Sequence, residues 1–446
     1  MSKLLLKKGT AIRKDWSLKL EKQKLAGDNI RFLKPSSPTF KEKSKNANNK
    51  IKIALYSHDT MGLGHKRRNT LIAKTLADSY LPTDILTITG IQEASDFPKR
   101  SGLDCLSLPA LYKTAEGLYQ SRYLNISLQK IIKLRGRIIK AALKAFDPDI
   151  LIVDKVPRGA VKELNPTLKY LRNLGKTHCI LGLRDVLDEP AAVRREWEKA
   201  GNDRAIRKYY DTIWVYGDPQ VYDLAREYQF AADIAAKIRY TGYFDRRVEL
   251  KYATAQSDRV LRDLSNLPEE FVLCLVGGGQ DGNLLAETFA RSEFPAETYG
   301  VILTGPFMSA EMKTKLHEWE LNNPHLIVRE FIAEPTLLID RASRVISMGG
   351  YNSIYELLSF EKKALIVPRV KPRLEQMLRA ENLQRLGLVD LLHPNDLTPQ
   401  ALTAWLAKEI KPVKARDLID FKGLDRLPHL IEDLIAQSSP SILKAL

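Results

Sequence analysis

The feature that most constrains the fold of this chain is a pattern that occurs twice, in which an apolar run ends in glycines and leads into helical sequence. The first copy reads IKIALYSHDTMGLGH (residues 51–65), and the second reads FVLCLVGGGQDG (residues 271–282). Strands that are apolar throughout and alternate with helices form parallel sheets with helices on both faces. The pattern therefore predicts an α/β protein with two successive doubly wound units.

The other apolar runs complete two series of strands. We expect strands of the first series within residues 84–90, 148–155, 176–185 and 211–218, and strands of the second within residues 297–305, 324–331, 341–350 and 363–369.

The two series define the expected domains. The first series closes near residues 238–247, the break lies in residues 243–268, and a hinge is expected near residues 243–250. We divide the chain into a tail, two Rossmann-like domains and a final helical segment that packs back on the body, at residues 1–50, 51–247, 248–415 and 416–446.

The net charge of +16 is unevenly distributed along the 446 residues. Residues 1–50 contain 14 Lys or Arg and 4 Asp or Glu, so they carry +10, and 16 − 10 leaves +6 for the rest. The polar end of this segment lacks periodicity and predicts a disordered tail. The tail is either a solvated leader or an electrostatic tether to anionic lipid or nucleic acid.

Cysteine usage and hydropathy predict a cytoplasmic location. Cys105, Cys179 and Cys274 each lie in an apolar run, which is typical of buried reduced thiols, and their spacing indicates no metal site. No apolar run reaches the roughly 18 residues that span a bilayer, and the N-terminus lacks the apolar core of a secretory signal.

The first glycine motif predicts a ligand site. Gly62 and Gly64 follow a strand and allow close approach of a ligand to the backbone, while His65 in the first helical turn can act as a base or donor. Arg67 and Arg68 follow and can support negative charge. The alternative is a tight turn in which His65 is only a cap.

The second domain contains two more glycine turns after strands. Gly278, Gly279 and Gln280 form one, which lacks the Lys-Ser/Thr of an ATP-hydrolysing P-loop and the G-x-G-x-x-G of a nicotinamide site. Gly349 and Gly350 form the other.

A helix follows the turn at residues 349–350. Asn352 or Ser353 can cap it, and Glu356 lies one turn further on. Glu356 could hold the vicinal hydroxyls of a ribose, or it could satisfy only backbone N–H groups as in a capping box.

These motifs resemble a known family. The pattern Gly-Gly-x-x-Ser-x-x-Glu-Leu-Leu at residues 349–358, the strand ending in Pro368, and RLEQMLRAENLQRLGLVDLL at residues 373–392 are similar to the donor-binding half of GT-B glycosyltransferases. The family most resembled is that of the peptidoglycan N-acetylglucosaminyltransferase MurG. The resemblance implies a GT-B fold, in which two Rossmann-like domains face each other across a cleft, and a nucleotide-sugar donor, most often a UDP-sugar.

The resemblance also implies roles for the residues around the donor. Glu356 would hold the ribose, and the backbone of Phe331 and Ile332 would hold the nucleobase. Glu375 and Gln376 would contact the donor sugar. The family has Gln at the position of Glu375, so the donor sugar of this chain can differ.

The glycine turns have counterparts in the same family. Gly278, Gly279 and Gln280 match the turn near the donor phosphates. The N-terminal Gly-x-Gly-His matches Gly62, Gly64 and His65, where the family histidine is a candidate base.

Three polar residues at the ends of strands are further candidates. Asp154 and Asp185 are reserve bases, and Arg184 can support phosphate charge, because ligands of α/β sheets bind at the carboxyl ends of strands. Each of these could instead be a surface charge. Residues 182–201 have no counterpart in the resembled family. No Asp-x-Asp motif stands at a strand end, so we expect no metal and no cofactor beyond the nucleotide sugar.

A helix over residues 128–146 is expected to have a basic face. Lys130, Lys133, Arg137, Lys140 and Lys144 recur every three or four residues, opposite an apolar face. Such a face is either simply solvated or meets anionic lipid headgroups or a phosphorylated acceptor.

The sequence therefore predicts a glycosyltransferase that uses a nucleotide sugar and an unidentified hydroxyl acceptor, for which a lipid-linked molecule is one candidate. One alternative is a nucleotide-sugar hydrolase, because GLGHKRR also looks like the loop of hydrolases related to the pseudaminic-acid pathway. Another is an inactive GT-B binding protein. Specific nucleic-acid binding is not expected, since the body shows no interleaving of aromatic and basic residues.

Overall fold

A computed structural model describes residues 50–57, 64–90, 101–114, 118–253, 267–279, 281–330, 335–409, 411 and 413–438. Contacts divide the chain into residues 1–47 and residues 48–446, and all the described residues lie in the second unit. The predicted tail and the predicted site residues Gly62, Gln280, Phe331 and Ile332 lie outside the described residues.

The described part of the N-terminal lobe (residues 50–247) is built on a seven-stranded parallel sheet of order β3-β2-β1-β6-β7-β8-β9. Its strands are β1 (Ile51–Tyr56), β2 (Thr83–Thr89), β3 (Leu103–Ser107), β6 (Ile150–Asp154), β7 (His178–Arg184), β8 (Thr212–Tyr216) and β9 (Ile238–Tyr240). The strand order reverses between β1 and β6, which is the Rossmann switch point where ligands bind.

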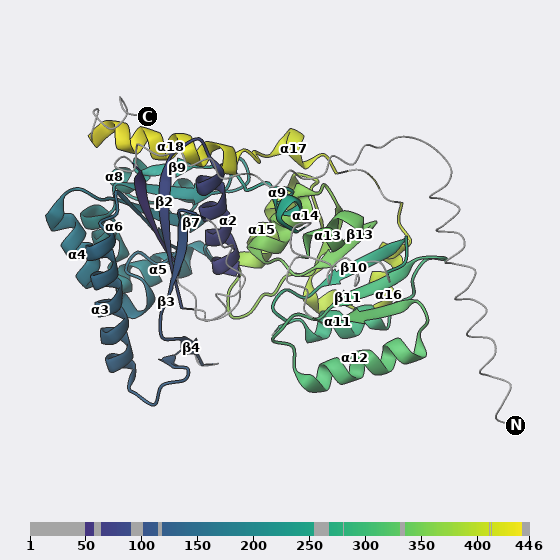
Figure 1. Cartoon of the computed structure of the whole chain (residues 1–446). Helices are drawn as coiled ribbons and strands as arrows, with labels where there is room; N and C mark the ends of the chain where they lie inside the picture. The colour runs from purple at the N-terminus through teal and green to yellow at the C-terminus, as the bar shows by residue number, and fades with distance from the viewer. Residues whose placement is uncertain are drawn as a thin grey trace, which may run out of the picture. The chain divides into compact units, whose positions relative to one another are not determined.

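Helices cover both faces of this sheet. They are α2 (Gly64–Asp78), α3 (Leu128–Phe146), α4 (Asn165–Leu174), α5 (Pro190–Ala200), α6 (Asn202–Tyr209), α7 (Leu224–Glu227) and α8 (Ala232–Ala235). In Figure 1 the sheet stands between α3, α4 and α6 on one side and α2 on the other.

The described part of the C-terminal lobe (residues 248–418) repeats this plan with a six-stranded parallel sheet of order β12-β11-β10-β13-β14-β15. Its strands are β10 (Phe271–Leu275), β11 (Tyr299–Leu303), β12 (Leu326–Arg329), β13 (Arg344–Ser347), β14 (Lys363–Ile366) and β15 (Asp390–Leu391). The switch point lies between β10 and β13.

The helices of this lobe are α9 (Val248–Ala253), α11 (Asn283–Ala290), α12 (Ala310–Asn322), α13 (Thr336–Arg341), α14 (Tyr351–Ser359), α15 (Glu375–Arg385), α16 (Pro399–Leu406) and α17 (Ala415–Leu418). In Figure 1, α11 and α12 lie on one side of β10 and β11, and α13 and α14 lie on the other.

The apolar runs explain the central strands of each sheet. Every residue of β6, β8 and β10 is buried, because helices cover both faces of these strands. The sequence did not predict the edge strands β3, β9 and β15 or the antiparallel hairpin β4 (Leu111–Lys113) and β5 (Tyr119–Ser121). These elements are short or only partly buried, so their apolar pattern is weak.

The final helix α18 (Gly423–Ser438) packs against α2 of the N-terminal lobe. Tyr80 donates a hydrogen bond from its hydroxyl to Glu432 Oε2 at 2.7 Å, and the N–H of Gly423 bonds the carbonyl of Tyr243 at 3.0 Å. The chain thus returns from the C-terminal lobe to the N-terminal lobe.

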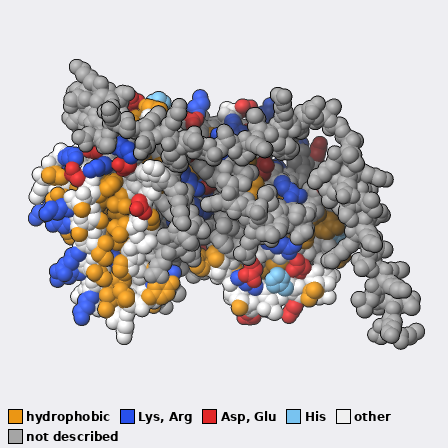
Figure 2. Space-filling view, in the orientation of Figure 1, with side chains coloured by type: hydrophobic (Ala, Val, Ile, Leu, Met, Phe, Trp, Pro, Cys, Tyr) orange, Lys and Arg blue, Asp and Glu red, His pale blue; other side chains and the backbone are white. Residues whose placement is uncertain are grey.

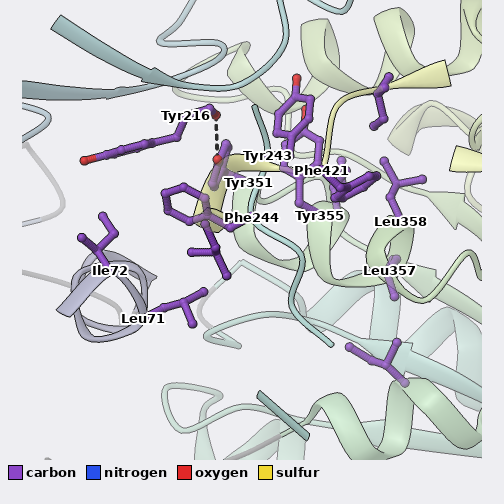
Figure 3. Close-up of a cluster of buried hydrophobic side chains, with 14 of the residues drawn as sticks. Leu71, Ile72, Tyr216, Tyr243, Phe244, Tyr351, Tyr355, Leu357, Leu358 and Phe421 are labelled. Carbon is purple, nitrogen blue, oxygen red and sulfur yellow. Dashed lines mark hydrogen bonds between the residues drawn. The ribbon is translucent and has the colours of Figure 1, made fainter. Parts of the chain in front are cut away.

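Aromatic side chains join the two lobes. Tyr351 of α14 donates a hydrogen bond to the backbone carbonyl of Tyr216 at the end of β8, over 2.7 Å, which Figure 3 shows as a dashed line. Tyr243 and Tyr355 stack with their ring centroids 3.7 Å apart. These contacts fix the first turns of α14 against the carboxyl edge of the N-terminal sheet.

Helix α3 has the predicted basic face. It spans Leu128–Phe146 and is capped by Ser127, whose side chain accepts a hydrogen bond from the N–H of Lys130. Its five predicted surface cations are all exposed, at positions 130, 133, 137, 140 and 144. Figure 2 shows Lys and Arg side chains along the edge of the molecule that α3 occupies. Within the described residues, no helix is both long and apolar enough for a membrane span.

Candidate active site

A cavity of about 650 Å³ lies where the carboxyl ends of the two sheets meet. The N-terminal lobe contributes His65 and Arg68 from α2 and Arg184 from the end of β7. The C-terminal lobe contributes the turn after β10 and the first turns of α14, including Glu356. The cavity therefore combines both predicted groups of site residues, and its volume suits a ligand of several hundred daltons.

His65 pairs with Asp154 at the wall of this cavity. The glycine-rich segment places His65 second in α2, and β6 ends at Asp154 beside it. His65 Nδ1 lies 2.5 Å from Asp154 Oδ2. The histidine side chain is 16% exposed and the aspartate is completely buried. The histidine is thus the member of the pair that a ligand can reach.

The surroundings of His65 determine whether its ring is charged and which ring nitrogen carries the proton. Burial lowers the pKa of His65 to about 4, although Asp154 acts in the opposite direction, so the ring is neutral near pH 7. The carboxylate has no proton to give, because Arg68 and His65 outweigh the effect of burial and hold the pKa of Asp154 well below its usual range. The single ring proton therefore belongs on Nδ1, which donates to Asp154, and Nε2 is the unprotonated nitrogen that can act as a base.

Arg68 completes this buried group. Its Nη2 lies 2.5 Å from Asp154 Oδ1, and its guanidinium lies 5.5 Å from the ring centre of Tyr216 and 5.6 Å from that of Tyr351. Arg68 therefore compensates the Asp154 charge and stacks between one aromatic ring from each lobe. Asp154 is held in place from two sides and orients the imidazole.

Glu356 lies in an ion-pair network that crosses between the lobes. Its Oε1 accepts from Arg67 Nη1 at 2.8 Å and from Arg246 Nη2 at 3.2 Å. Arg246 also forms an ion pair with Glu249, whose Oε2 lies 2.8 Å from Arg246 Nε. The side chain of Glu356 is 2% exposed and lines the cavity. Glu356 is therefore not the capping-box residue that formed the alternative prediction.

The capping prediction for α14 needs a correction. The N-cap of this helix is Gly350, and no side chain caps it. Asn352 instead donates from Nδ2 to the backbone carbonyl of Gly64 at 2.9 Å, across the two lobes. The side-chain amide of Asn352 cannot cap α14, because residue 352 lies inside the first turn of the helix and a capping residue precedes that turn. The N–H groups at the start of α14 thus remain available at the cavity wall, where an anion is favourable.

The turn after β10 has the conformation that a glycine turn requires. Gly277 and Gly279 have φ of 62° and 89°, in the left-handed region, and Gly277 and Gly278 are exposed at the cavity. A Cβ at Gly279 would lie 2.8 Å from the N of Met308, so the turn packs too closely against the next one for any side chain.

Arg184 brings positive charge to the N-terminal wall, and Lys155, which does not itself line the cavity, is close enough to Arg184 to interact with it electrostatically. Arg184 lines the cavity, and its buried Nε has no hydrogen-bond partner among the described residues. Burial, Arg379 and Arg68 lower its pKa to about 10. Burial, Arg184 and Arg373 lower the pKa of Lys155, one residue past β6, to about 7. Both side chains would be stabilised by an anion in the cavity.

The two residues predicted to contact the donor sugar occupy different places. Gln376 lines the cavity, and its Oε1 accepts from the backbone N–H of Arg369 at 3.0 Å. Glu375 is 5% exposed and pairs with Arg369 Nη2 at 2.8 Å. Burial opposes ionisation of Glu375, but Arg184 and Arg369 outweigh it and lower the pKa of the carboxyl.

Asp185, predicted as a reserve base, lies in a buried hydrogen-bond network. It is completely buried and is not among the residues that line the cavity. Arg379 of α15 donates to Oδ1 at 2.9 and 3.0 Å, and the hydroxyl groups of Tyr243 and Tyr355 donate to Oδ2. Of the two aspartates that end strands, Asp154 therefore contacts the candidate base His65. Asp185 instead links the two lobes.

The other predicted positions lie around the cavity. Gly64 and Arg67 line it, as do Gly350 and Ser353. Gly349 packs behind it, where a Cβ would lie 2.9 Å from the Cβ of Gln376.

Sequence reasoning missed several residues at the cavity. Gly305 and Phe307 follow β11 and line the wall, and their TGPF sequence after an apolar run was the available signal. Arg122 and Arg246 carried no such signal, because each reaches the site only through tertiary packing. Among the described residues, no group of three or more His, Cys, Asp or Glu is arranged to hold a metal ion.

Comparison with known proteins gives a family match for the C-terminal lobe and similar folds for most of the chain. Residues 272–417 match the family model described as the glycosyltransferase family 28 C-terminal domain. This range runs from β10 to α17 and so covers the lobe that carries Glu356. A comparison with curated protein sequences finds no match.

Solved structures share the fold at low sequence identity. MurG from Acinetobacter baumannii is 14% identical, with 86% of this chain and 99% of that chain covered and a TM-score of 0.54. The calicheamicin glycosyltransferase CalG4 is 13% identical, with 88% and 100% covered and a TM-score of 0.54. The UDP-GlcNAc 2-epimerase from Neisseria meningitidis, bound to UDP-GlcNAc, is 13% identical, with 87% and 100% covered and a TM-score of 0.58.

These comparisons confirm the predicted GT-B fold and the resemblance to MurG-like glycosyltransferases. The fold by itself is shared with epimerases, so it does not separate these activities. The family match at residues 272–417, together with the fold, supports a glycosyltransferase.

Proposed function

We propose, from the premise that residues 272–417 are a glycosyltransferase family 28 C-terminal domain, that the protein transfers a sugar from a UDP-sugar to an acceptor hydroxyl. The observation that carries this proposal is the shared cavity of about 650 Å³. It joins a buried His–Asp pair in one lobe to glycine turns and a buried glutamate in the other.

The donor is proposed to lie along the C-terminal lobe. Its diphosphate would meet the exposed backbone of Gly277 and Gly278 and the uncapped start of α14, with Arg184 opposite. Helix N-termini and exposed backbone N–H groups are favourable sites for phosphate. The ribose hydroxyls would bond Glu356, which its ion pairs with Arg67 and Arg246 hold in place.

The acceptor hydroxyl is proposed to lose its proton to His65. Nε2 takes the proton as the acceptor oxygen forms a bond to the anomeric carbon and the bond from that carbon to the diphosphate oxygen breaks. The nucleoside diphosphate leaves with the bonding electron pair. Asp154 stabilises the imidazolium that forms, because its carboxylate accepts the hydrogen bond from Nδ1. Arg184 and the N-terminus of α14 stabilise the charge on the leaving group.

Hydrolysis of the nucleotide sugar is the second candidate. It would use the same residues with water as the acceptor, and the fold of UDP-GlcNAc 2-epimerases is compatible with chemistry at the donor alone. The two activities differ in what releases UDP. Transfer requires an added acceptor for fast release, whereas hydrolysis does not.

The binding step can be tested first. Melting temperature is measured with UDP, GDP, ADP, TDP and UDP-GlcNAc, because a ligand bound to the native state raises it by mass action. We expect a rise with UDP and UDP-GlcNAc that is lost in Glu356→Ala. Glu318→Ala, an exposed glutamate on α12, is the matched control and should keep the rise. No rise with any nucleotide would contradict the proposal and favour an inactive binding protein.

The reaction is tested by UDP release from UDP-GlcNAc and other UDP-sugars, with and without acceptors. Release that depends on an acceptor supports transfer, and rapid release without one supports hydrolysis. His65→Gln should abolish either activity and leave UDP binding unchanged, since His65 belongs to the opposite lobe.

We further propose that the protein is cytoplasmic and contacts the inner face of a membrane through α3 and the basic tail, where it would meet a lipid-linked acceptor. This is supported by the exposed cations of α3 and by the exposed Tyr123 and Leu124 just before it. Basic and apolar side chains together favour the interface of an anionic bilayer. Replacing Lys133 and Arg137 by Gln should weaken sedimentation with anionic vesicles, whereas Lys408→Gln in the C-terminal lobe should not.

A further inference from the structure

A second cavity, of about 350 Å³, lies in the N-terminal lobe and shares no lining residue with the first. Three segments form it: the loop after β6, the start of α4, and the region from the end of α5 through α6. Its charged lining residues are Arg158, Lys169, Arg204 and Lys208. Its lining contains no acidic residue.

These four cations have no acidic partner within the described part of the chain. None of them forms an ion pair with any residue that the structure describes. By contrast, Arg207 of the same helix α6 does not line the cavity. It forms an ion pair with Asp233, with Nε 2.5 Å from Oδ2. Four like charges around one concavity repel one another, and an anion between them removes that cost.

Arg158 is the most constrained of the four. Its Nε is buried and has no hydrogen-bond partner among the described residues. A Cβ at Gly201 would lie 3.7 Å from Arg158 Nη2, so the guanidinium reaches the wall that Gly201 forms. The loop that carries it is braced, because Tyr210 donates a hydrogen bond to the carbonyl of Pro157 and Gly159 takes φ of 68°. An unpaired buried donor is costly, and a ligand acceptor would satisfy it.

We propose that this cavity binds the phosphate of a phosphomonoester ligand, separately from the donor site. A phosphate dianion offers several acceptor oxygens to converging Arg and Lys groups, and arginine pairs with it through two N–H groups at once. Tyr209 lines the same cavity, and Lys208 Nζ lies 5.4 Å from the centre of its ring, so the aromatic ring positions one of the cations. The volume is at the lower end of small-molecule sites, which fits a sugar phosphate or a lipid phosphate headgroup.

The first arm of the test uses a soluble probe. Full-length protein is saturated with UDP to fill the donor cavity and titrated with glucose 6-phosphate by calorimetry. We expect glucose 6-phosphate to bind at one site even though UDP already fills the donor cavity. Arg204→Gln/Lys208→Gln, two exposed positions that leave the partly buried Arg158 intact, should weaken this binding by roughly tenfold or more. Arg158→Gln tests this partly buried member separately.

A matched control removes the same charge nearby. Arg194→Gln/Arg195→Gln changes two exposed arginines of the neighbouring helix α5 that do not line the cavity. This variant should bind glucose 6-phosphate as the wild type does. Equal weakening in this control would mean a diffuse electrostatic effect and would overturn the proposal.

The second arm identifies the source of the phosphate. The same proteins are sedimented with phosphatidylcholine vesicles that contain or lack phosphatidic acid. Binding of glucose 6-phosphate supports a soluble metabolite, and binding only to vesicles with phosphatidic acid, lost in Arg204→Gln/Lys208→Gln but not in the control, supports a lipid headgroup. Binding of neither probe to the wild type would overturn the proposal. Because UDP binding is scored independently, failure here is distinct from failure of the proposed transferase.

Discussion

Arg67 and Glu356, 289 positions apart in the sequence, form an ion pair of 2.8 Å that joins the first turn of α2 to α14 across the candidate active site. The pair is part of a network with Arg246, so the glutamate is nearly buried and fixed in direction. A carboxylate held in this way is a rigid acceptor for two neighbouring hydroxyl groups.

This relationship predicts how the protein distinguishes ribose from deoxyribose. Wild-type protein should bind UDP about tenfold or more tightly than 2′-deoxy-UDP, because a charged hydrogen bond is lost with the hydroxyl. In Glu356→Gln the two affinities should become similar, and both should be lower. The measurement is calorimetric titration with each nucleotide. Equal affinities in the wild type would show that Glu356 does not contact the ribose.

His65 is expected to carry the proton transfer. His65→Gln keeps a polar side chain but removes the base, so kcat should fall by about 10²- to 10⁴-fold with little change in UDP affinity. Chemical denaturation of the variant checks that the fold is intact. A loss of UDP binding as large as the loss of kcat would instead make His65 a binding residue.

The pH dependence follows from the lowered pKa of His65. The acidic limb of kcat/KM should lie near pH 4 to 5 rather than at the ordinary value of 6.5, because the ring stays neutral down to about pH 4. The stability of the folded protein should also decrease as the pH falls. The unfolded chain takes up a proton at 6.5 and the folded chain only at about 4, so the contribution of His65 to stability is lost as the pH falls between these values.

Two measurements check this pH dependence. One is the kcat/KM profile, and the other is the difference in unfolding free energy between the wild type and His65→Gln as a function of pH. A limb at 6.5 together with a pH-independent difference would contradict the buried, neutral histidine.

Asp185 is expected to matter for stability. Asp185→Asn leaves the completely buried Arg379 without its counter-ion, and breaking a buried pair in this way costs about 3–5 kcal/mol. The midpoint of chemical denaturation should fall markedly. Asp233→Asn is the control, since it breaks the exposed pair with Arg207 and should change nothing measurable. If Asp185→Asn had the stability of the wild type and no activity, Asp185 would be a catalytic residue after all.

Donor binding is expected to draw a proton into the site. Lys155 has a pKa of about 7, so it is mostly neutral at pH 8, and an anionic donor beside Arg184 should raise that value. Titration of UDP at pH 8 in buffers of different ionisation enthalpy should show uptake of about one proton, which Lys155→Met removes. No uptake in the wild type would place the diphosphate away from this wall.

The sequence by itself determined the two-lobed α/β plan of the molecule. Continuous apolar runs, such as those of β6 and β10, indicate strands buried on both faces, and the glycines after them indicate where backbone must approach a ligand. Because these signals are local, they placed His65, Gly278 and Glu356 correctly at strand ends and helix starts.

The tertiary structure decided which of these residues meet. Asp154 and Asp185 look alike in the sequence, since each ends a buried strand. Only the packing puts His65 beside the first and Arg379 beside the second. Likewise Asn352 seemed a helix cap, and only the approach of α2 turned its amide towards Gly64. Contacts between distant segments depend on how the sheets and lobes pack, and that is set by the sum of many weak interactions rather than by any motif.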